Sequence, residues 1–102
     1  MDKVLYECYY VVGCRHIHSC YKMTVDKETD RMYYGVVLND RFAVNKGNLN
    51  RVHKIVDRKH GTVYRVQIDD AESEHEAKQK AKEIICDYII GFVERFKNNK
   101  ED

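Results

Sequence analysis

The last third of the chain constrains the fold most, because its apolar residues recur every three or four positions, as on one face of a helix. The repeat begins at Ala77 and continues to Phe96 without a proline. A continuous stripe of this length predicts one long amphipathic helix that packs on the rest of the protein. Its members are Ala77, Ala81, Ile84, Ile85, Tyr88, Phe92 and Phe96.

The two halves of this stripe differ in character. Ser73 precedes Glu76 by three positions, which is the spacing of a capping box, so we expect the helix to begin there. Ile89, Ile90 and Val93 widen the apolar face in the second half. The widened face favours burial against a sheet, and the alternative is a surface for a partner protein or for a second copy of the chain.

The sequence before the helix has the alternation and the Tyr and Val content of β-strands. Residues 4–25 are too many for one strand, so we expect a turn among them, centred on Ile17. This register places Cys14 opposite Cys20 and collects the odd-numbered residues on one apolar face, which we expect to be core.

The middle of the chain is less uniform. Residues 32–44 predict a second hairpin around Asn39 and Asp40. Residues 48–61 fit a short helix and a hairpin equally well, and residues 63–68 fit a strand.

The order of these elements predicts an α+β fold, an antiparallel β-sheet of four to six strands with a long C-terminal amphipathic helix packed on one face. A chain of 102 residues supports one hydrophobic core. We therefore expect a single α+β domain over residues 1–96, followed by a polar C-terminal tail over residues 97–102.

The start of the chain lacks the cationic residues and the apolar run of a secretory signal. No stretch approaches the roughly 18 consecutive apolar residues of a membrane span. We therefore expect a cytoplasmic protein that does not use a membrane, and we expect its four cysteines to be reduced thiols.

Charge is distributed unevenly along the chain. Residues 41–65 hold seven Lys or Arg and one Asp, whereas residues 66–87 hold three Lys and seven Asp or Glu. With Phe42 and Tyr64 among the cations, the basic segment suits phosphates and stacked bases, or an acidic protein surface. The alternative is a solvated edge that keeps the sheet from pairing with another chain. The candidate partner-binding residues are Arg41, Lys46, Arg51, Lys54, Arg58, Lys59 and Arg65.

Four potential metal ligands lie within seven residues: Cys14, His16, His18 and Cys20. A hairpin centred between them would bring the two thiols together below the two imidazoles, which makes a closed structural zinc site the metal hypothesis for this chain. The spacing is not that of a zinc finger. A disulfide between Cys14 and Cys20, or two thiols beside solvent-facing histidines, are the alternatives.

Signatures of catalysis are missing from the sequence. The glycines never form a Gly-x-Gly loop, so the backbone requirement of nucleotide sites is not met. His75 and Glu76 begin a motif that resembles a zinc-protease helix, but Gln79 stands where the second histidine is needed. We therefore expect a non-enzymatic protein with no cofactor other than the structural zinc considered above.

The chain has no proline, eight tyrosines and many Lys and Asn residues, and in size and style it resembles the small accessory proteins of phages and mobile elements, which include the anti-CRISPR proteins. The resemblance implies a non-catalytic module that blocks or recruits a larger machine by surface complementarity. We expect a protein-binding module, an inhibitor or regulator of a nucleic-acid-processing complex, whose partner is a larger protein or nucleoprotein complex. The alternative is a domain that binds nucleic acid directly through residues 41–65.

Overall fold

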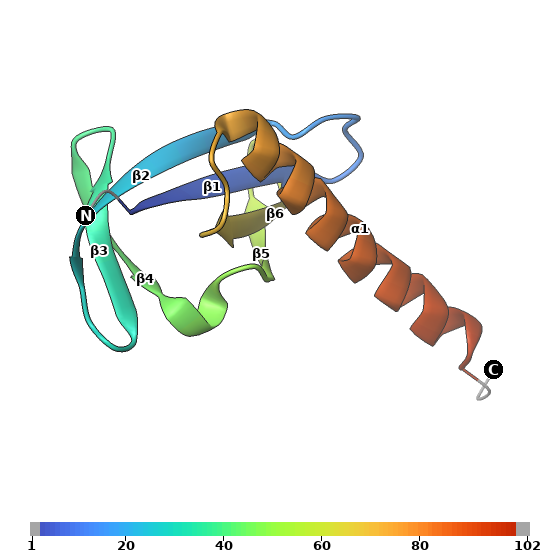
Figure 1. Cartoon of the computed structure of the whole chain (residues 1–102). Helices are drawn as coiled ribbons and strands as arrows, with labels where there is room; N and C mark the ends of the chain where they lie inside the picture. Colours follow the sequence, from blue (N-terminus) through green and yellow to red (C-terminus); the bar gives the residue numbers. More distant parts are fainter. Residues whose placement is uncertain (1–2, 100–102) are drawn as a thin grey trace.

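A computed structural model describes residues 3–99 and confirms the α+β class. Six antiparallel strands form one curled sheet in the order β4-β3-β2-β1-β6-β5, and the first half of the long C-terminal helix packs on one face of it (Figure 1). The elements are β1 (Val4–Val11), β2 (Ser19–Glu28), β3 (Met32–Val37), β4 (Asp40–Asn45), the 3-10 helix η1 (Lys46–Asn48), β5 (Val52–Asp57), β6 (Gly61–Ile68) and α1 (Glu74–Lys97).

Both faces of the sheet are buried, each by a different part of the chain. On the helix face, even-numbered residues of β1 and β6 pack against Ala77, Ala81 and Ile85. On the other face, the curl of β3 and β4 over the sheet encloses a second cluster. That second cluster contains Leu5, Met23, Val25, Tyr33 and Val44.

The first hairpin turns earlier than the sequence predicts. The register pairs Cys8 with Cys20 and Tyr9 with Ser19, so the connection runs from Val12 to His18 and is not centred on Ile17. The odd-numbered Leu5, Met23 and Val25 are core, as expected, but the expectation missed that α1 buries the even-numbered face of β1 as well. Burial on both faces fixes the register, since a slip by one residue would exchange the two sets.

The second hairpin is formed by β3 and β4, and the segment after it forms a third hairpin, β5 and β6. Leu38 and Asn39 form the two-residue turn with φ angles of 48° and 72°, one position before the predicted turn. Residues 48–61, which fitted a helix or a hairpin, contain β5 and the turn into β6.

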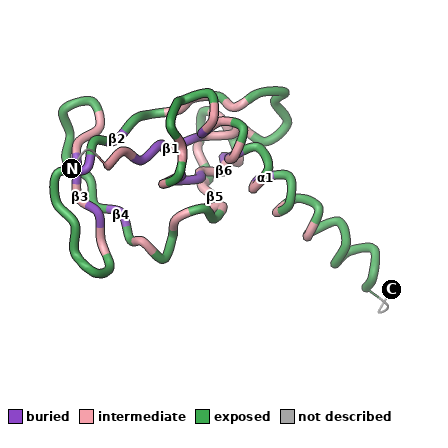
Figure 2. Tube along the Cα trace, in the orientation of Figure 1, coloured by how far each residue is buried: buried purple, intermediate pink, exposed green. Residues whose placement is uncertain are grey.

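Helix α1 begins as expected and then leaves the sheet. The Ser73 Oγ accepts a hydrogen bond from the backbone N–H of Glu76 at 3.1 Å, as in the predicted cap. Burial ends at Ile85, and the remainder of α1 projects beyond the strands (Figures 1 and 2). Burial of the widened second half, the interpretation favoured by the sequence, is therefore wrong. Of the predicted tail, Lys97 is helical and residues 100–102 lie outside the described part of the chain.

Replacement of Ile85 by Asp should unfold the domain or cost about 4 kcal/mol or more, because the carboxylate would lie in the helix–sheet core, where Ile85 is 4% exposed. Ile90→Asp is the matched control on the same helix. Ile90 is 52% exposed, so this change should cost less than about 1 kcal/mol. Urea titration followed by circular dichroism measures both variants, and a wild-type midpoint for Ile85→Asp would contradict the packing described here.

Gly35→Ala should destabilise the domain by about 1 to 3 kcal/mol, because a Cβ at this position in β3 would overlap the backbone carbonyl of Thr24 in β2. Gly91→Ala is the control in α1, where the nearest atom to a new Cβ is Arg95 Nη1 at 3.5 Å. That change should be neutral or stabilise by up to about 1 kcal/mol, since alanine is the better helix former. In thermal melts, Gly35→Ala should therefore lower the melting temperature, whereas Gly91→Ala should leave it unchanged or raise it.

Candidate functional site

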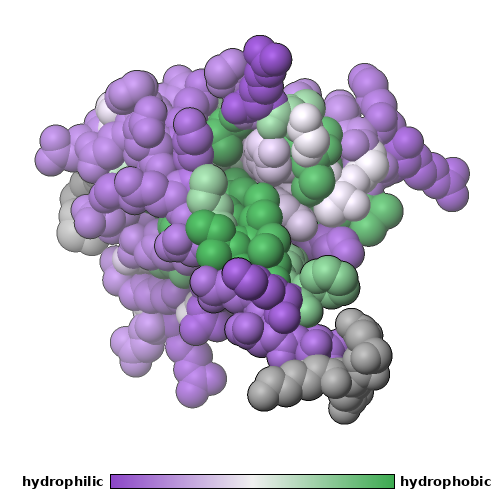
Figure 3. Space-filling view, turned by 90° about the vertical axis from the view of Figure 1, so that its right-hand side faces the viewer, coloured by the Kyte–Doolittle hydropathy of each residue, from purple (hydrophilic) through white to green (hydrophobic). Residues whose placement is uncertain are grey.

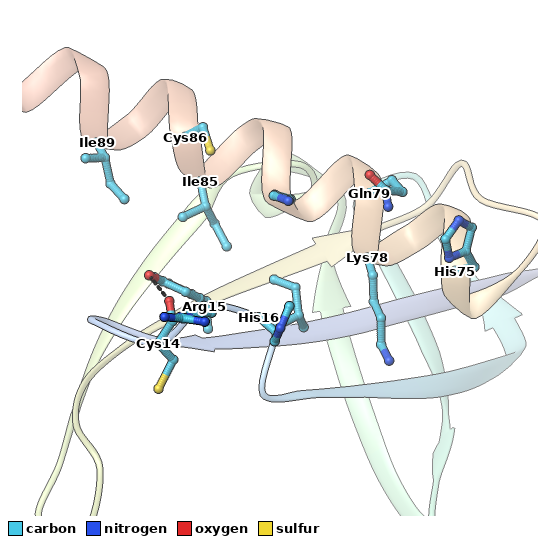
Figure 4. Close-up of a pocket in the computed structure, with 12 residues that line it drawn as sticks. Cys14, Arg15, His16, His75, Lys78, Gln79, Ile85, Cys86 and Ile89 are labelled. Carbon is cyan, nitrogen blue, oxygen red and sulfur yellow. Dashed lines mark hydrogen bonds between the residues drawn. The ribbon is translucent and has the colours of Figure 1, made fainter.

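A pocket of about 350 Å³ lies between the β1–β2 loop and α1 (Figure 4). The loop contributes Cys14, Arg15, His16 and Ile17, and the remaining lining residues come from β1 and α1. From these two elements the pocket receives Tyr10, His75, Lys78, Gln79, Lys82, Ile85, Cys86 and Ile89.

Local hydrogen bonds hold the loop in this position. The Tyr10 hydroxyl donates to the carbonyl oxygen of Cys14 at 2.7 Å, and the Cys14 N–H donates to the Val11 carbonyl at 3.0 Å. Gly13 provides the positive φ of 100° that the turn requires. Ile17 packs against the helix-side core, so the loop is attached at both ends of its span.

The charge of the pocket is one-sided. Its lining includes three cations, Arg15, Lys78 and Lys82, with two histidines and no carboxylate. Lys78 forms an ion pair with Glu74, with 3.3 Å between Lys78 Nζ and Glu74 Oε1, whereas Arg15 and Lys82 form no ion pair within residues 3–99. The pocket therefore offers a positive potential beside an apolar floor, which suits an anionic group attached to an apolar body.

An apolar ridge continues from the pocket along the projecting part of α1. We define the ridge as Ile89, Phe92, Val93 and Phe96, of which Phe92 is 45% and Phe96 is 79% exposed. Ile89 belongs to both features, so the pocket and the ridge are continuous. Apolar surface gathers over this part of the molecule in the space-filling view (Figure 3). Exposure of neighbouring large side chains on this scale is typical of an interaction surface.

Aromatic packing stabilises the start of the ridge. The Tyr88 ring lies edge-on to Tyr64 of β6 at 5.2 Å and to Phe92 at 4.8 Å, measured between ring centroids. The Arg95 guanidinium lies 4.9 Å from the centroid of Phe92. The ridge is thus connected to the sheet through a chain of ring contacts, although its outer side chains face solvent.

Charges on this part of α1 separate by face. At 3.6 residues per turn, Lys82, Arg95 and Lys97 flank the ridge. Carboxylates occupy the far side of the helix, at Glu83, Asp87 and Glu94. The exposed face is consequently apolar and cationic, and this separation was not predicted from the sequence.

The predicted basic segment is divided by the fold. Strands β4 and β5 form opposite edges of the sheet, and the cations of the segment lie on β4, β5 and β6 or in the turns and the 3-10 helix beside them. On the β4 side, Arg41 makes two hydrogen bonds to Asp26, at 2.8 and 2.9 Å, and Lys46 pairs with Glu28.

The other five predicted cations lie on the β5–β6 side. Arg51, Lys54, Arg58 and Lys59 are exposed on β5 or in the turns beside it, and Arg65 is half-buried on β6. The seven residues thus occupy two separated regions, and none of them lines the pocket.

The four predicted metal ligands also separate. Cys14 and His16 line the pocket. His18 instead lies beside His60, with 5.1 Å between the centroids of the two imidazole rings. Cys20 faces Cys8, whose thiol donates a hydrogen bond to the Cys20 sulfur at 3.2 Å. This bond lowers the pKa of Cys20, and the same bond together with burial raises the pKa of Cys8. Across residues 3–99, no three His, Cys, Asp or Glu side chains are grouped to hold a metal ion.

A second small pocket, of about 270 Å³, surrounds the His18 and His60 pair on the other face of the sheet. The His60 Nδ1 lies 2.8 Å from a carboxylate oxygen of Asp57, and this hydrogen bond lowers the pKa of Asp57. The sequence reasoning missed this contact because it depends on the β1–β2 loop and the β5–β6 turn reaching the same end of the sheet.

Comparisons with family models, curated proteins and solved structures find no match to this chain. Among the described residues, no helix has the length and apolarity needed to cross a bilayer. The functional interpretation therefore depends on the geometry of the pocket and the ridge.

Proposed function

We propose that this protein is a non-enzymatic protein-binding module that docks on an amphipathic, acidic helix of a partner protein. The observation that carries the proposal is the continuity between the exposed apolar ridge and the cation-lined pocket. A helix with apolar residues on one face would cover the ridge, and carboxylates beside that face would meet Arg15 and Lys82.

The surface available fits a protein partner. The exposed parts of the four ridge side chains amount to about 500 Å² of apolar area. Together with the pocket, they provide an area near the lower end of what one side of a standard protein interface buries, about 600 to 1,000 Å² per partner. Aromatic and Arg side chains such as Phe92, Phe96 and Arg95 are typical of the residues that dominate binding energy.

A second copy of the chain is less suited to the same surface. Two ridges packed face to face would bring together the flanking cations of both copies, Lys82, Arg95 and Lys97, and like charges in an interface are unfavourable. An anionic membrane would also satisfy these cations, but the pocket is recessed between the loop and α1, which fits a projecting side chain better than a flat surface.

Direct binding of nucleic acid through residues 41–65 is the weaker candidate. Binding along a nucleic-acid backbone needs a continuous line of cations. Arg41 and Lys46 are paired with carboxylates at one edge of the sheet, and the other five cations of the segment lie on the opposite side. The resemblance to phage accessory proteins supports a partner that belongs to a larger nucleic-acid-processing complex, which this module would inhibit or regulate.

The test uses two labelled helical peptides of about 14 residues, with leucines along one face and either glutamates or lysines beside them. In fluorescence polarisation, the glutamate peptide should bind at least about tenfold more tightly than the lysine peptide. Phe92→Ser should weaken this binding about tenfold by removing apolar contact, and Lys82→Glu should remove the preference for the glutamate peptide.

The matched control is charge reversal at Arg51, Lys54, Arg58 and Lys59 together, which lie outside the pocket and should leave peptide binding unchanged. Equal binding of the two peptides, or no binding, would contradict the proposal. Light scattering that shows a dimer sensitive to Phe92→Ser would assign the ridge to a second copy. Salt-sensitive binding to double-stranded DNA that the fourfold reversal abolishes would favour the nucleic-acid alternative, and binding to phosphatidylserine vesicles that Phe92→Ser abolishes would favour a membrane.

A further inference from the structure

Two cysteine thiols face each other across the centre of the sheet. Cys8 of β1 and Cys20 of β2 are directly opposite in the antiparallel register, and their sulfur atoms are 3.2 Å apart. Both are free thiols in this structure. The predicted partner of Cys20 was Cys14, but Cys14 is exposed in the loop at the rim of the pocket.

The backbone positions of this pair suit a disulfide. Directly opposite residues in an antiparallel pair have Cα atoms about 4.5 to 5.5 Å apart, which lies within the range that disulfides span. The sulfur atoms need to approach by about 1.2 Å to reach the bonded distance of about 2.05 Å. Side-chain rotation supplies a shift of this size, so the sheet does not need to rearrange.

The surroundings give the two sulfurs different roles. Cys8 has no exposed surface, because Val66 and Ala81 belong to the same core cluster beneath α1. Cys20 is only partly buried, so a small oxidant reaches it first. The Cys20 sulfur also accepts the hydrogen bond from the Cys8 thiol, and this bond favours negative charge on Cys20.

We propose that Cys8 and Cys20 form a site of reversible oxidation, with hydrogen peroxide as oxidant and a low-molecular-weight thiol as reductant. The Cys20 thiolate attacks the peroxide oxygen, the O–O bond breaks, and Cys20 becomes a sulfenic acid while one water leaves. The Cys8 sulfur then attacks the Cys20 sulfur, the S–O bond breaks, and the oxygen leaves as a second water. The two thiols lose two electrons and two protons, and the peroxide is reduced to two waters.

The bond would fasten β1 to β2 directly below the contact with α1. A disulfide removes conformations from the unfolded chain, so the oxidised protein should be more stable than the reduced one. The redox state would then set the stability of the sheet on which the pocket and the ridge are held. Because Cys8 and Cys20 do not line the pocket, this inference does not depend on the proposed partner.

The experiment uses the full chain with Cys14→Ser and Cys86→Ser, two exposed positions, so that only the paired thiols remain. After treatment with hydrogen peroxide and blocking of remaining thiols with N-ethylmaleimide, the monomer should lack both maleimide adducts and have lost about 2 Da. Its melting temperature should rise by at least about 5 °C. Reduction with dithiothreitol should restore the original mass and the original melting temperature.

Cys8→Ala in the wild-type background is the matched control, since it retains Cys14 and Cys20. It should not form an intramolecular disulfide under the same conditions. A Cys14–Cys20 bond in this control, a covalent dimer in place of the monomeric disulfide, or full maleimide labelling of Cys8 and Cys20 after oxidation would each overturn the proposal. Peptide mapping of the oxidised wild type shows which cysteine is bonded to Cys20 without the serine substitutions. Fragmentation in the mass spectrometer distinguishes Cys8 from Cys14 where both lie in one peptide.

Discussion

The contact between the first half of α1 and one face of the sheet determines the rest of the structure. Ala77 and Ala81 are fully buried there, and their small side chains let the helix approach β1 and β6 closely. Ile85 completes the contact and is the last buried residue of the helix. The direction of α1 is thereby fixed over its first turns, and the remaining turns continue straight into solvent. The pocket forms where the β1–β2 loop meets this fixed segment.

Burial of both faces gives the sheet a second constraint. The helix covers the even-numbered face of β1, while β3 and β4 curl over the odd-numbered face, so residues as different as Cys8 and Leu5 are both buried. A strand that is enclosed on both sides cannot be assigned one inner face from its alternation alone. The same enclosure holds Cys8 against Cys20, because the register that buries Leu5 opposite Met23 also sets the two thiols opposite each other.

Much of the fold was predictable from the sequence, and the errors have a common physical origin. The helix, its Ser73 cap and the presence of two hairpins before residue 46 follow from local spacing, and the structure confirms them. Local spacing left residues 48–61 open between a helix and the hairpin that the structure contains. The position of the first turn does not follow from local spacing, because alternation in residues 4–25 is compatible with several turn positions, and the position found depends on long-range pairing and packing on both faces of β1. An error of three residues in the turn centre exchanged Cys8 for Cys14 as the partner of Cys20 and so changed the expected chemistry of the cluster.

The candidate site was harder to predict, because the same apolar stripe serves a helix buried on its own sheet and a helix that binds a partner. Helix length distinguishes the two cases. At about 1.5 Å per residue, the 24 residues of α1 extend about 36 Å, whereas the eight residues of β6 extend about 27 Å. A helix held at its N-terminal half by Ala77 and Ala81 must therefore extend beyond the strands, and its last turns are the ones that Ile89, Ile90 and Val93 make most apolar. Length and anchoring together, rather than the width of the stripe, indicate that this apolar surface is available to another molecule.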